Sequence, residues 1–175
     1  MAETSRHDGW QAGDSYECYM GRWSRRLAPR FLDWLAAPPG LDWLEIGCGT
    51  GALSAAIVER CAPASLIAID PSESFVAMAR ANVESGRATF QVGDAQALGA
   101  ASASRDAIVS GLVLNFVPDK AKALAEMKRV ARPNGRVAFY VWDYAGGGAA
   151  FLRFFWRAAA ALDPRAQELT ESSRF

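Results

Sequence analysis

Cysteine and histidine are scarce in this 175-residue sequence, which has three cysteines and one histidine. The cysteines, at positions 18, 48 and 61, match neither a zinc knuckle nor a CxxC pair. We therefore expect free thiols in a reducing cytoplasm, no disulfide framework and no metal site. His7 lies in a polar N-terminal stretch, and we interpret it as a tail residue rather than a catalytic base.

A long apolar run and a net charge are also missing. No run approaches the roughly 20 residues of a membrane span, and the polar N-terminus has no apolar signal segment. Nineteen basic residues balance nineteen acidic ones, so no overall field draws the chain to nucleic acid or to a membrane. We interpret the local basic patch as a solvated helix face, formed by Arg22, Arg25, Arg26 and Arg30. These absences predict a cytoplasmic protein with no nucleic-acid and no membrane partner.

Within what we expect to be a single domain, residues 1–38 are predicted to form an N-terminal helical lid and residues 39–175 a core. In residues 21–37 the apolar positions recur at helical spacing, with the arginines largely opposite. The predicted buried face consists of Trp23, Leu27, Phe31, Trp34 and Leu35. Pro29 lies inside this pattern and predicts a kink or two short helices.

After Gly40, strand and helix patterns alternate. We expect strands at residues 43–46, 66–70, 88–92, 107–114 and 136–142. Helices are expected at residues 50–61, 72–84 and 149–162, with a further helix that is capped by Asp119, buries Leu124, Met127 and Val130, and stops at the turn 132–135. This alternation predicts an α/β fold, a Rossmann-like doubly wound sheet of mainly parallel strands with flanking helices. Ligands of such sheets bind at the carboxyl ends of the strands, where the strand order reverses.

The informative residues fall at those strand ends. Glycines at 47, 49 and 51 follow a predicted strand and open a helix, which permits a tight turn and close approach to a ligand. A tight turn without a ligand is the alternative, although three alternating glycines exceed what a turn needs. Asp70 ends the second strand, 19 residues after Gly51. A carboxylate there can accept hydrogen bonds from both ribose hydroxyls of an adenosine ligand, or simply cap the next helix.

Together these residues resemble the class I S-adenosylmethionine (SAM)-dependent methyltransferases, in the branch called methyltransferase type 11 or 25, over roughly residues 19–144. The resemblance implies that the loop amides face the amino-acid end of SAM, with Glu45 near its amino group and Asp70 on its ribose. It places Pro71 and Ser72 beside the adenine and Asp94 on its exocyclic amine. Asn115 and Phe116 would face the methyl donor or acceptor. Tyr19 and Trp23 would close over the cofactor as lid aromatics. The implied cofactor-binding residues are Tyr19, Trp23, Glu45, Gly47, Cys48, Gly49, Gly51, Asp70, Pro71, Ser72, Gly93, Asp94, Ala95, Asn115 and Phe116.

The implied function is methyl transfer from SAM to a small-molecule acceptor, with S-adenosylhomocysteine as the product. Such a transfer needs alignment of donor and acceptor and exclusion of water, and a general base is optional. We therefore name no catalytic residue, although Asp143 and Tyr144 end the fifth strand and could line an acceptor pocket. One alternative is a non-catalytic SAM-binding or oligomerising fragment. A less favoured one is an NAD-dependent oxidoreductase, which needs Gly-x-Gly-x-x-Gly where this sequence has Ala52.

The sequence departs from the family after the fifth strand. Family members continue into an antiparallel hairpin beside that strand, whereas the 31 residues after Tyr144 read as a helix and a polar tail. The fifth strand would then be an exposed apolar edge, which proteins normally avoid. We expect either a truncated product or a partner chain on this edge, and we predict a homodimer or other assembly through it.

Overall fold

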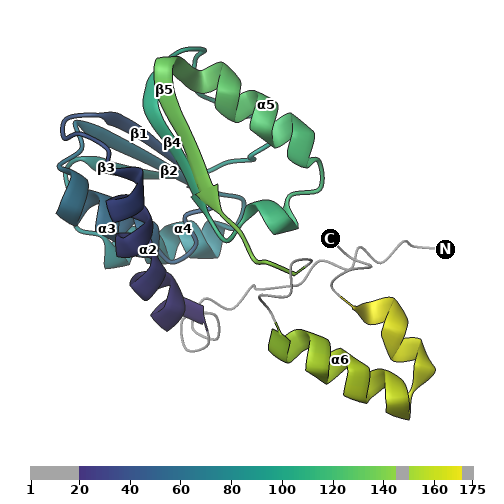
Figure 1. The fold of residues 1–175 in the computed structure, drawn as a ribbon. Coiled ribbons are helices and arrows are strands. Elements are labelled where there is room, and N and C mark those ends of the chain that lie inside the picture. Colours follow the sequence, from purple (N-terminus) through teal and green to yellow (C-terminus); the bar gives the residue numbers. More distant parts are fainter. Residues whose placement is uncertain (1–19, 145–149, 171–175) are drawn as a thin grey trace.

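The computed structural model describes residues 20–144 and 150–170, and five parallel strands lie at its centre. Strand order is β3-β2-β1-β4-β5 (Figure 1), which confirms the predicted doubly wound α/β sheet. The order reverses between β1 and β4, so a ligand crevice is expected beyond their carboxyl ends. The strands are β1 (Asp42–Ile46), β2 (Ser65–Asp70), β3 (Ala88–Val92), β4 (Arg105–Gly111) and β5 (Ala131–Tyr140).

Helices cover both faces of the sheet because side chains alternate along each strand. In β1, Trp43 points into a core shared with α2 (Arg22–Leu35) and α3 (Ala52–Cys61), whereas Leu44 and Ile46 join the core under α5 (Lys120–Val130). The remaining helix, α4 (Glu73–Asn82), packs against β2 and β3. Figure 1 shows α5 on the opposite side of the sheet from α2, α3 and α4.

Helix α2 buries a different face from the predicted one. Its buried side chains are those of Ser24, Ala28, Phe31 and Leu32. Trp23, Leu27 and Trp34 are instead exposed by 46, 39 and 72%, so the prediction was wrong for these three. The reason lies in packing, because the small side chains at 24 and 28 let α2 lie close against α3. Of the two alternatives expected at Pro29, a kink or two short helices, the second is wrong, since a single helix runs through Pro29.

Three further predictions differ in detail. Strand β4 ends at Gly111, because Leu112 has φ +62° and the chain turns into the 3-10 helix η2 (Leu114–Phe116). Strand β5 begins directly after α5, and the expected turn at 132–135 is an irregular part of its register in which Asn134 has φ +65°. On α5, Ala123 takes the inward position and Leu124 is 39% exposed.

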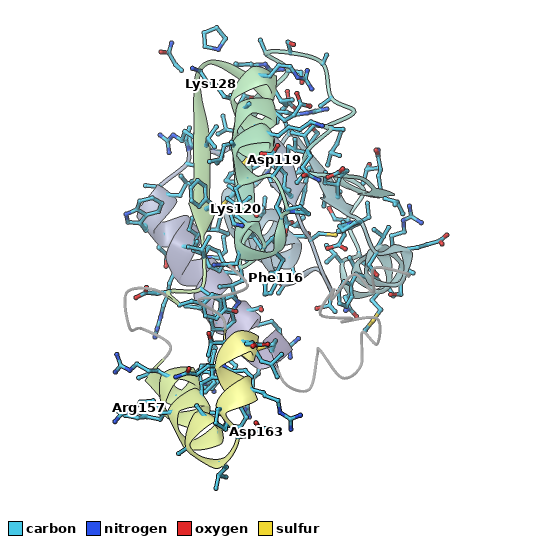
Figure 2. All side chains as sticks on the ribbon, turned by 90° about the vertical axis from the view of Figure 1, so that its right-hand side faces the viewer. Phe116, Asp119, Lys120, Lys128, Arg157 and Asp163 are labelled. Atoms are coloured by element: carbon cyan, nitrogen blue, oxygen red, sulfur yellow. The ribbon has the colours of Figure 1, made fainter. Side chains whose placement is uncertain are left out.

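Helix α6 (Ala150–Leu162) and the 3-10 helix η3 (Pro164–Leu169) extend away from the sheet. In Figure 2, Arg157 and Asp163 of this segment lie apart from α5 and the sheet. No side chain of α6 is buried. Across residues 20–144 and 150–170, none of the helices combines the length and the hydropathy that a bilayer crossing demands.

Candidate functional site

The loop after β1 is fastened to the end of β2. The amides of Gly47 and Cys48 both donate to the carbonyl oxygen of Ile69, at 2.7 and 2.9 Å. The amide of Gly49 donates to Oδ2 of Asp70 at 3.0 Å, and that of Gly51 to the carbonyl of Cys48 at 2.9 Å. These four amides are used within the protein, which differs from the expectation that the loop amides face a ligand.

The three loop glycines serve different purposes, although all have positive φ. A Cβ at Gly47 would lie 2.3 Å from a methyl of Val113, and a Cβ at Gly51 would lie 2.9 Å from a methyl of Val83. Packing against neighbouring segments therefore requires glycine at both positions. A Cβ at Gly49 would meet no atom within 4 Å. Gly49 alone borders open space, which is where a ligand can approach the backbone closely.

Asp70 lies beside Gly49 at the carboxyl end of β2. Its Oδ2 accepts from Gly49 N and its Oδ1 accepts from Ser72 N at 2.9 Å. Burial raises the pKa of Asp70, and these two amides oppose the shift. A carboxylate has about four acceptor positions, so each oxygen keeps one for a further donor. The arrangement suits recognition of two adjacent hydroxyl groups.

Glu45 is buried behind the loop, with 1% of its surface exposed. Ser54 of α3 donates its hydroxyl hydrogen to Glu45 Oε2. Burial raises the pKa of Glu45 to about 8, repulsion from Asp70 adds to the shift, and the Ser54 hydroxyl opposes it. Glu45 is therefore mainly protonated at neutral pH, and it reaches a ligand only through intervening atoms.

The side chain of Cys48 also points away from open space. It is buried among Val76, Ala79 and Phe90, between α4 and the sheet. Burial is the largest cause of a raised pKa for its thiol, which makes the group a poor nucleophile. Cys48 can contribute only its backbone to a cofactor site.

The residues predicted for the adenine side lie after β2 and β3. Pro71 is exposed, and Ser72 caps α4 by accepting from Phe75 N at 3.4 Å. Asp94 is exposed, and its Oδ1 accepts from the Gln96 amide at 2.8 Å. That bond is the largest cause of a lowered pKa for Asp94. Gly93 packs on Ile69, and Ala95 is buried in the core under α5.

Asn115 and Phe116 lie in η2, beyond β4. The Asn115 side chain bridges to the chain after β5, donating to the Trp142 carbonyl at 3.1 Å and accepting from its amide at 2.8 Å. Phe116 is 39% exposed (Figure 2). Trp23 lies in the first turn of α2, where the guanidinium groups of Arg22 and Arg26 lie over its ring. Tyr19 lies outside the described residues. Their roles toward a cofactor stay predictions.

Two contributors at this edge were not foreseen. Val113, which follows β4, packs closely against Gly47, and Gln96 holds Asp94 through its amide and side chain. A valine after an apolar strand gives no distinguishing signal. A glutamine two residues after Asp94 could have been found from the Asp turn pattern, in which the aspartate accepts from the amide two residues ahead.

Comparisons with known proteins agree on the family. A profile described as Methyltransferase domain matches residues 44–139. The malonyl-[acyl-carrier protein] O-methyltransferase of Methylococcus capsulatus is 34% identical over 122 residues, 69% of this chain and 44% of that protein. A ubiquinone/menaquinone biosynthesis C-methyltransferase of Paracoccus denitrificans is 34% identical over 110 residues, 61% of this chain and 44% of that protein. The chain thus spans less than half the length of these two relatives.

The solved structures show the same fold. A Methanococcus maripaludis protein superposes with a TM-score of 0.69 at 20% identity, covering 99% of this chain and 80% of its own. The profile match spans more than half of the sequence and contains the end of β1 and all of β2, β3 and β4, with the loops that follow these strands. The chain belongs to the methyltransferase domain family, with the Rossmann-like fold of class I methyltransferases.

Proposed function

We propose that this chain binds SAM at the carboxyl edge of its sheet and transfers the methyl group to a small-molecule acceptor. Family membership supports methyl transfer, and the Methanococcus maripaludis protein is provisionally described as SAM-dependent. The observation that carries the proposal is the pairing of Asp70 with Gly49. This pairing joins a carboxylate with spare acceptor positions to the one loop glycine that borders open space.

The described residues fit an adenosyl cofactor. A Cβ at Gly49 would meet no atom within 4 Å, so a ligand has room to approach the backbone there. Asp70 is 6% exposed, which limits its contact to a group placed directly over the loop. In the proposed complex Asp70 holds the ribose hydroxyls, the loop supports the amino-acid end, and Asp94 and Ala95 border the adenine.

When bound, SAM supplies an electrophilic methyl group on a sulfonium whose positive charge disperses during transfer. The protein contributes position and exclusion of water, which together lower such a barrier by about 7–11 kcal/mol. The loop after β1 is suited to positioning the cofactor, because three consecutive amides hold it to β2 through hydrogen bonds. No residue is assigned as a general base.

The acceptor is proposed only as a small molecule. The Methylococcus capsulatus relative is named for an O-methylation and the Paracoccus denitrificans relative for a C-methylation. Because this chain covers 44% of each of them, neither substrate is carried over. Neither the fold nor the proposed cofactor site identifies the acceptor, because a shared fold does not determine which substrate a protein binds.

Calorimetry with the 175-residue chain tests the proposal. We expect SAM and S-adenosylhomocysteine to bind with micromolar affinity and NADH to give no heat. A second assay follows transfer of a labelled methyl group to a panel of oxygen, nitrogen, carbon and sulfur acceptors. Binding without transfer to any acceptor would favour the non-catalytic alternative. Heat from NADH alone would favour an oxidoreductase and end the proposal.

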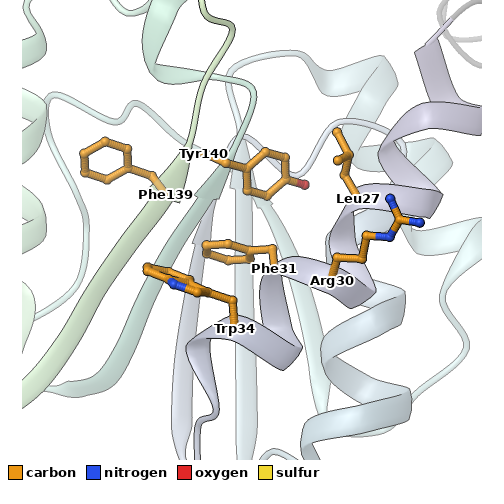
Figure 3. Close-up of a pocket in the computed structure, with 6 residues that line it drawn as sticks. All are labelled: Leu27, Arg30, Phe31, Trp34, Phe139 and Tyr140. Carbon is orange, nitrogen blue, oxygen red and sulfur yellow. The ribbon is translucent and has the colours of Figure 1, made fainter.

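We propose, in addition, that a second copy of this chain covers the open edge of β5. A hollow of about 350 Å³ lies between α2 and this edge, lined by Leu27, Arg30, Phe31, Trp34, Phe139 and Tyr140 (Figure 3). Along the same edge, Val137 of β5 and Val141 directly after it are exposed by 39 and 44%. An open strand edge flanked by exposed apolar side chains is a surface that a second chain can cover.

A further inference from the structure

The connection between β3 and β4 is fastened to the last turns of α5. Glu126 Oε2 accepts a hydrogen bond from the Leu98 amide at 2.8 Å. Further along, the amides of Ala103 and Ser104 donate to the carbonyl groups of Arg129 and Val130, each at 2.9 Å. The connection is therefore held to one helix at its middle and at its C-terminal end.

The Arg129 guanidinium donates several hydrogen bonds to the same segment. One terminal nitrogen, Nη2, donates to the Leu98 carbonyl at 3.0 Å. The other, Nη1, donates to the Ala100 carbonyl at 3.0 Å and to Ser102 Oγ at 3.2 Å. Nε and Nη2 also donate to the two carboxylate oxygens of Glu126, at 2.6 and 2.8 Å. The planar guanidinium thus bridges Glu126 and three residues of the connection, a geometry that lysine cannot reproduce.

The other end of this connection carries the residues predicted for the adenine. Gln96 donates through Nε2 to Asp94 Oδ1 at 3.2 Å and accepts at Oε1 from the Asp119 amide at 3.0 Å. Asp119 is the residue that caps α5. The side chains of Ala95 and Leu98 are buried against Met127 and Val130 of α5. The orientation of residues 94–98 therefore depends on α5.

The number of backbone contacts separates this pair from an ordinary surface ion pair. An isolated pair at i and i+3 on a helix surface contributes little to stability. Here the side chains of Glu126 and Arg129 are 20% and 35% exposed. Both also form hydrogen bonds with the backbone of the connection between β3 and β4. The Arg129 guanidinium lowers the pKa of Glu126 to about 2, so the pair stays charged across the physiological range.

We propose that Glu126 and Arg129 are positioning residues that fix residues 94–98 for recognition of the adenine ring. This inference rests on the proposed SAM site, and it gives two side chains of α5 a role in cofactor selectivity. They touch no part of a cofactor themselves. Their effect reaches the ligand through the Leu98 backbone and through Ala95 and Asp94.

The test compares S-adenosylhomocysteine with S-inosylhomocysteine, in which a carbonyl oxygen replaces the exocyclic amine of adenine. The native chain should prefer the adenosyl ligand by about tenfold or more, as expected for one hydrogen bond to a charged group. Glu126→Ala and Arg129→Met should reduce this preference to less than threefold while binding of S-inosylhomocysteine changes by less than twofold. Lys128→Met is the matched control, since it removes one charge from an exposed position on the same helix (Figure 2).

Hydrogen exchange supplies a second readout, because the Leu98 amide should exchange at least tenfold faster in both variants. If Glu126→Ala does not fold, Glu126→Gln keeps the side-chain size and an acceptor, and it should reduce the preference in part. Equal weakening of both ligands in a folded variant would make the pair merely structural and overturn the inference. Undiminished preference would overturn it as well. A native chain that binds neither ligand would instead refute the proposed SAM site.

Discussion

The Gly49 amide donates a hydrogen bond of 3.0 Å to Asp70 Oδ2, so one carboxylate serves both the loop after β1 and the site beyond β2. Because Ser72 N occupies the other oxygen, Asp70 is held in one orientation before any ligand arrives. Preorganisation of this kind lowers the cost of binding, since no side chain has to be ordered. The pair therefore offers the sharpest place to test the proposed site.

Asp70→Asn should weaken binding of S-adenosylhomocysteine by about 10- to 100-fold, the range expected when a hydrogen bond to a charged group is lost. An asparagine keeps one acceptor oxygen for the loop, but its NH2 group cannot accept from a hydroxyl. Calorimetry measures the change, with Asp163→Asn as a control because Asp163 pairs only locally with Arg165. Native affinity in Asp70→Asn would remove Asp70 from the ribose role.

Alanine at the loop glycines should separate packing from ligand approach. Gly49→Ala adds a Cβ in open space at φ +50°, so we expect about 1–2 kcal/mol of backbone strain and at least tenfold weaker binding. Gly40→Ala is the matched control, with φ +80° and equally open space, and it should keep native affinity. Urea unfolding and calorimetry measure the two effects. Equal affinity in both variants would show that nothing approaches Gly49.

Gly47→Ala should behave differently. Its Cβ would meet Val113 at 2.3 Å, and a β-branched side chain cannot move aside easily. Overpacking of this kind costs typically 1–3 kcal/mol in addition to the strain. We expect Gly47→Ala to lower the free energy of unfolding more than Gly49→Ala does. The reverse order would mean that the crevice between β1 and β4 is looser than the structure shows.

Local patterns predicted the sheet well. Residues 88–92 form β3 as expected, and Asp119 caps α5, accepting from Lys122 N at 2.9 Å. Both features depend on a few neighbouring residues, through strand alternation in one case and a short capping contact in the other. The Rossmann-like order then follows from right-handed crossovers between parallel strands.

Features that depend on contacts between distant segments could not be predicted from the sequence. The wide apolar arc of α2 holds both Phe31 and Trp34, and only packing against α3 decides that Phe31 is buried and Trp34 is not. The loop amides were expected to face a ligand because glycine spacing does not reveal that Ile69 and Asp70 accept from them. Glu126 and Arg129 look like a solvated pair, since their backbone partners lie almost 30 residues away.

The stability of the protein should fall as pH rises from about 5 to 8, because Glu45 has a pKa of about 8 when folded against an ordinary value of 4.5. In this range the folded state keeps a proton that the unfolded state has released, so the contribution is complete below the ordinary value and is lost as pH rises toward 8. The slope from this one group is at most about 1.4 kcal/mol per pH unit.

Glu45→Gln removes the titration while keeping a neutral group of the same size near Ser54. We expect urea unfolding at pH 5, 6, 7 and 8 to give a flatter dependence for this variant than for the native chain. The carboxyl groups with lowered pKa values titrate at more acid pH; they are Asp42, Asp94, Asp106, Glu126 and Asp163. Asp70, whose pKa is raised, is present in both proteins, so the difference between the two slopes reports Glu45. Identical slopes in the two proteins would mean that Glu45 is hydrated in solution.

The open edge of β5 should make the 175-residue chain associate at micromolar concentration. Val137→Lys and Phe139→Lys each place a charge on this edge, a change that blocks pairing of exposed strands. In sedimentation velocity we expect a dimer for the native chain and a monomer for either variant, with little change in the melting temperature. Phe154→Lys is the control, since Phe154 is 59% exposed on α6, a helix that lies away from β5 in Figure 1.

Salt should strengthen this association. Four arginines of α2 are exposed along the helix that borders the edge, and two copies bring these like charges toward each other. Ions shorten the range of that repulsion from about 30 Å at 10 mM to about 8 Å at 150 mM, whereas the apolar contact persists. A dimer that dissociates on adding salt, or one that is lost in Phe154→Lys and kept in Phe139→Lys, would place the contact elsewhere. A native monomer that binds no hydrophobic dye would contradict the prediction of an exposed, pairing edge.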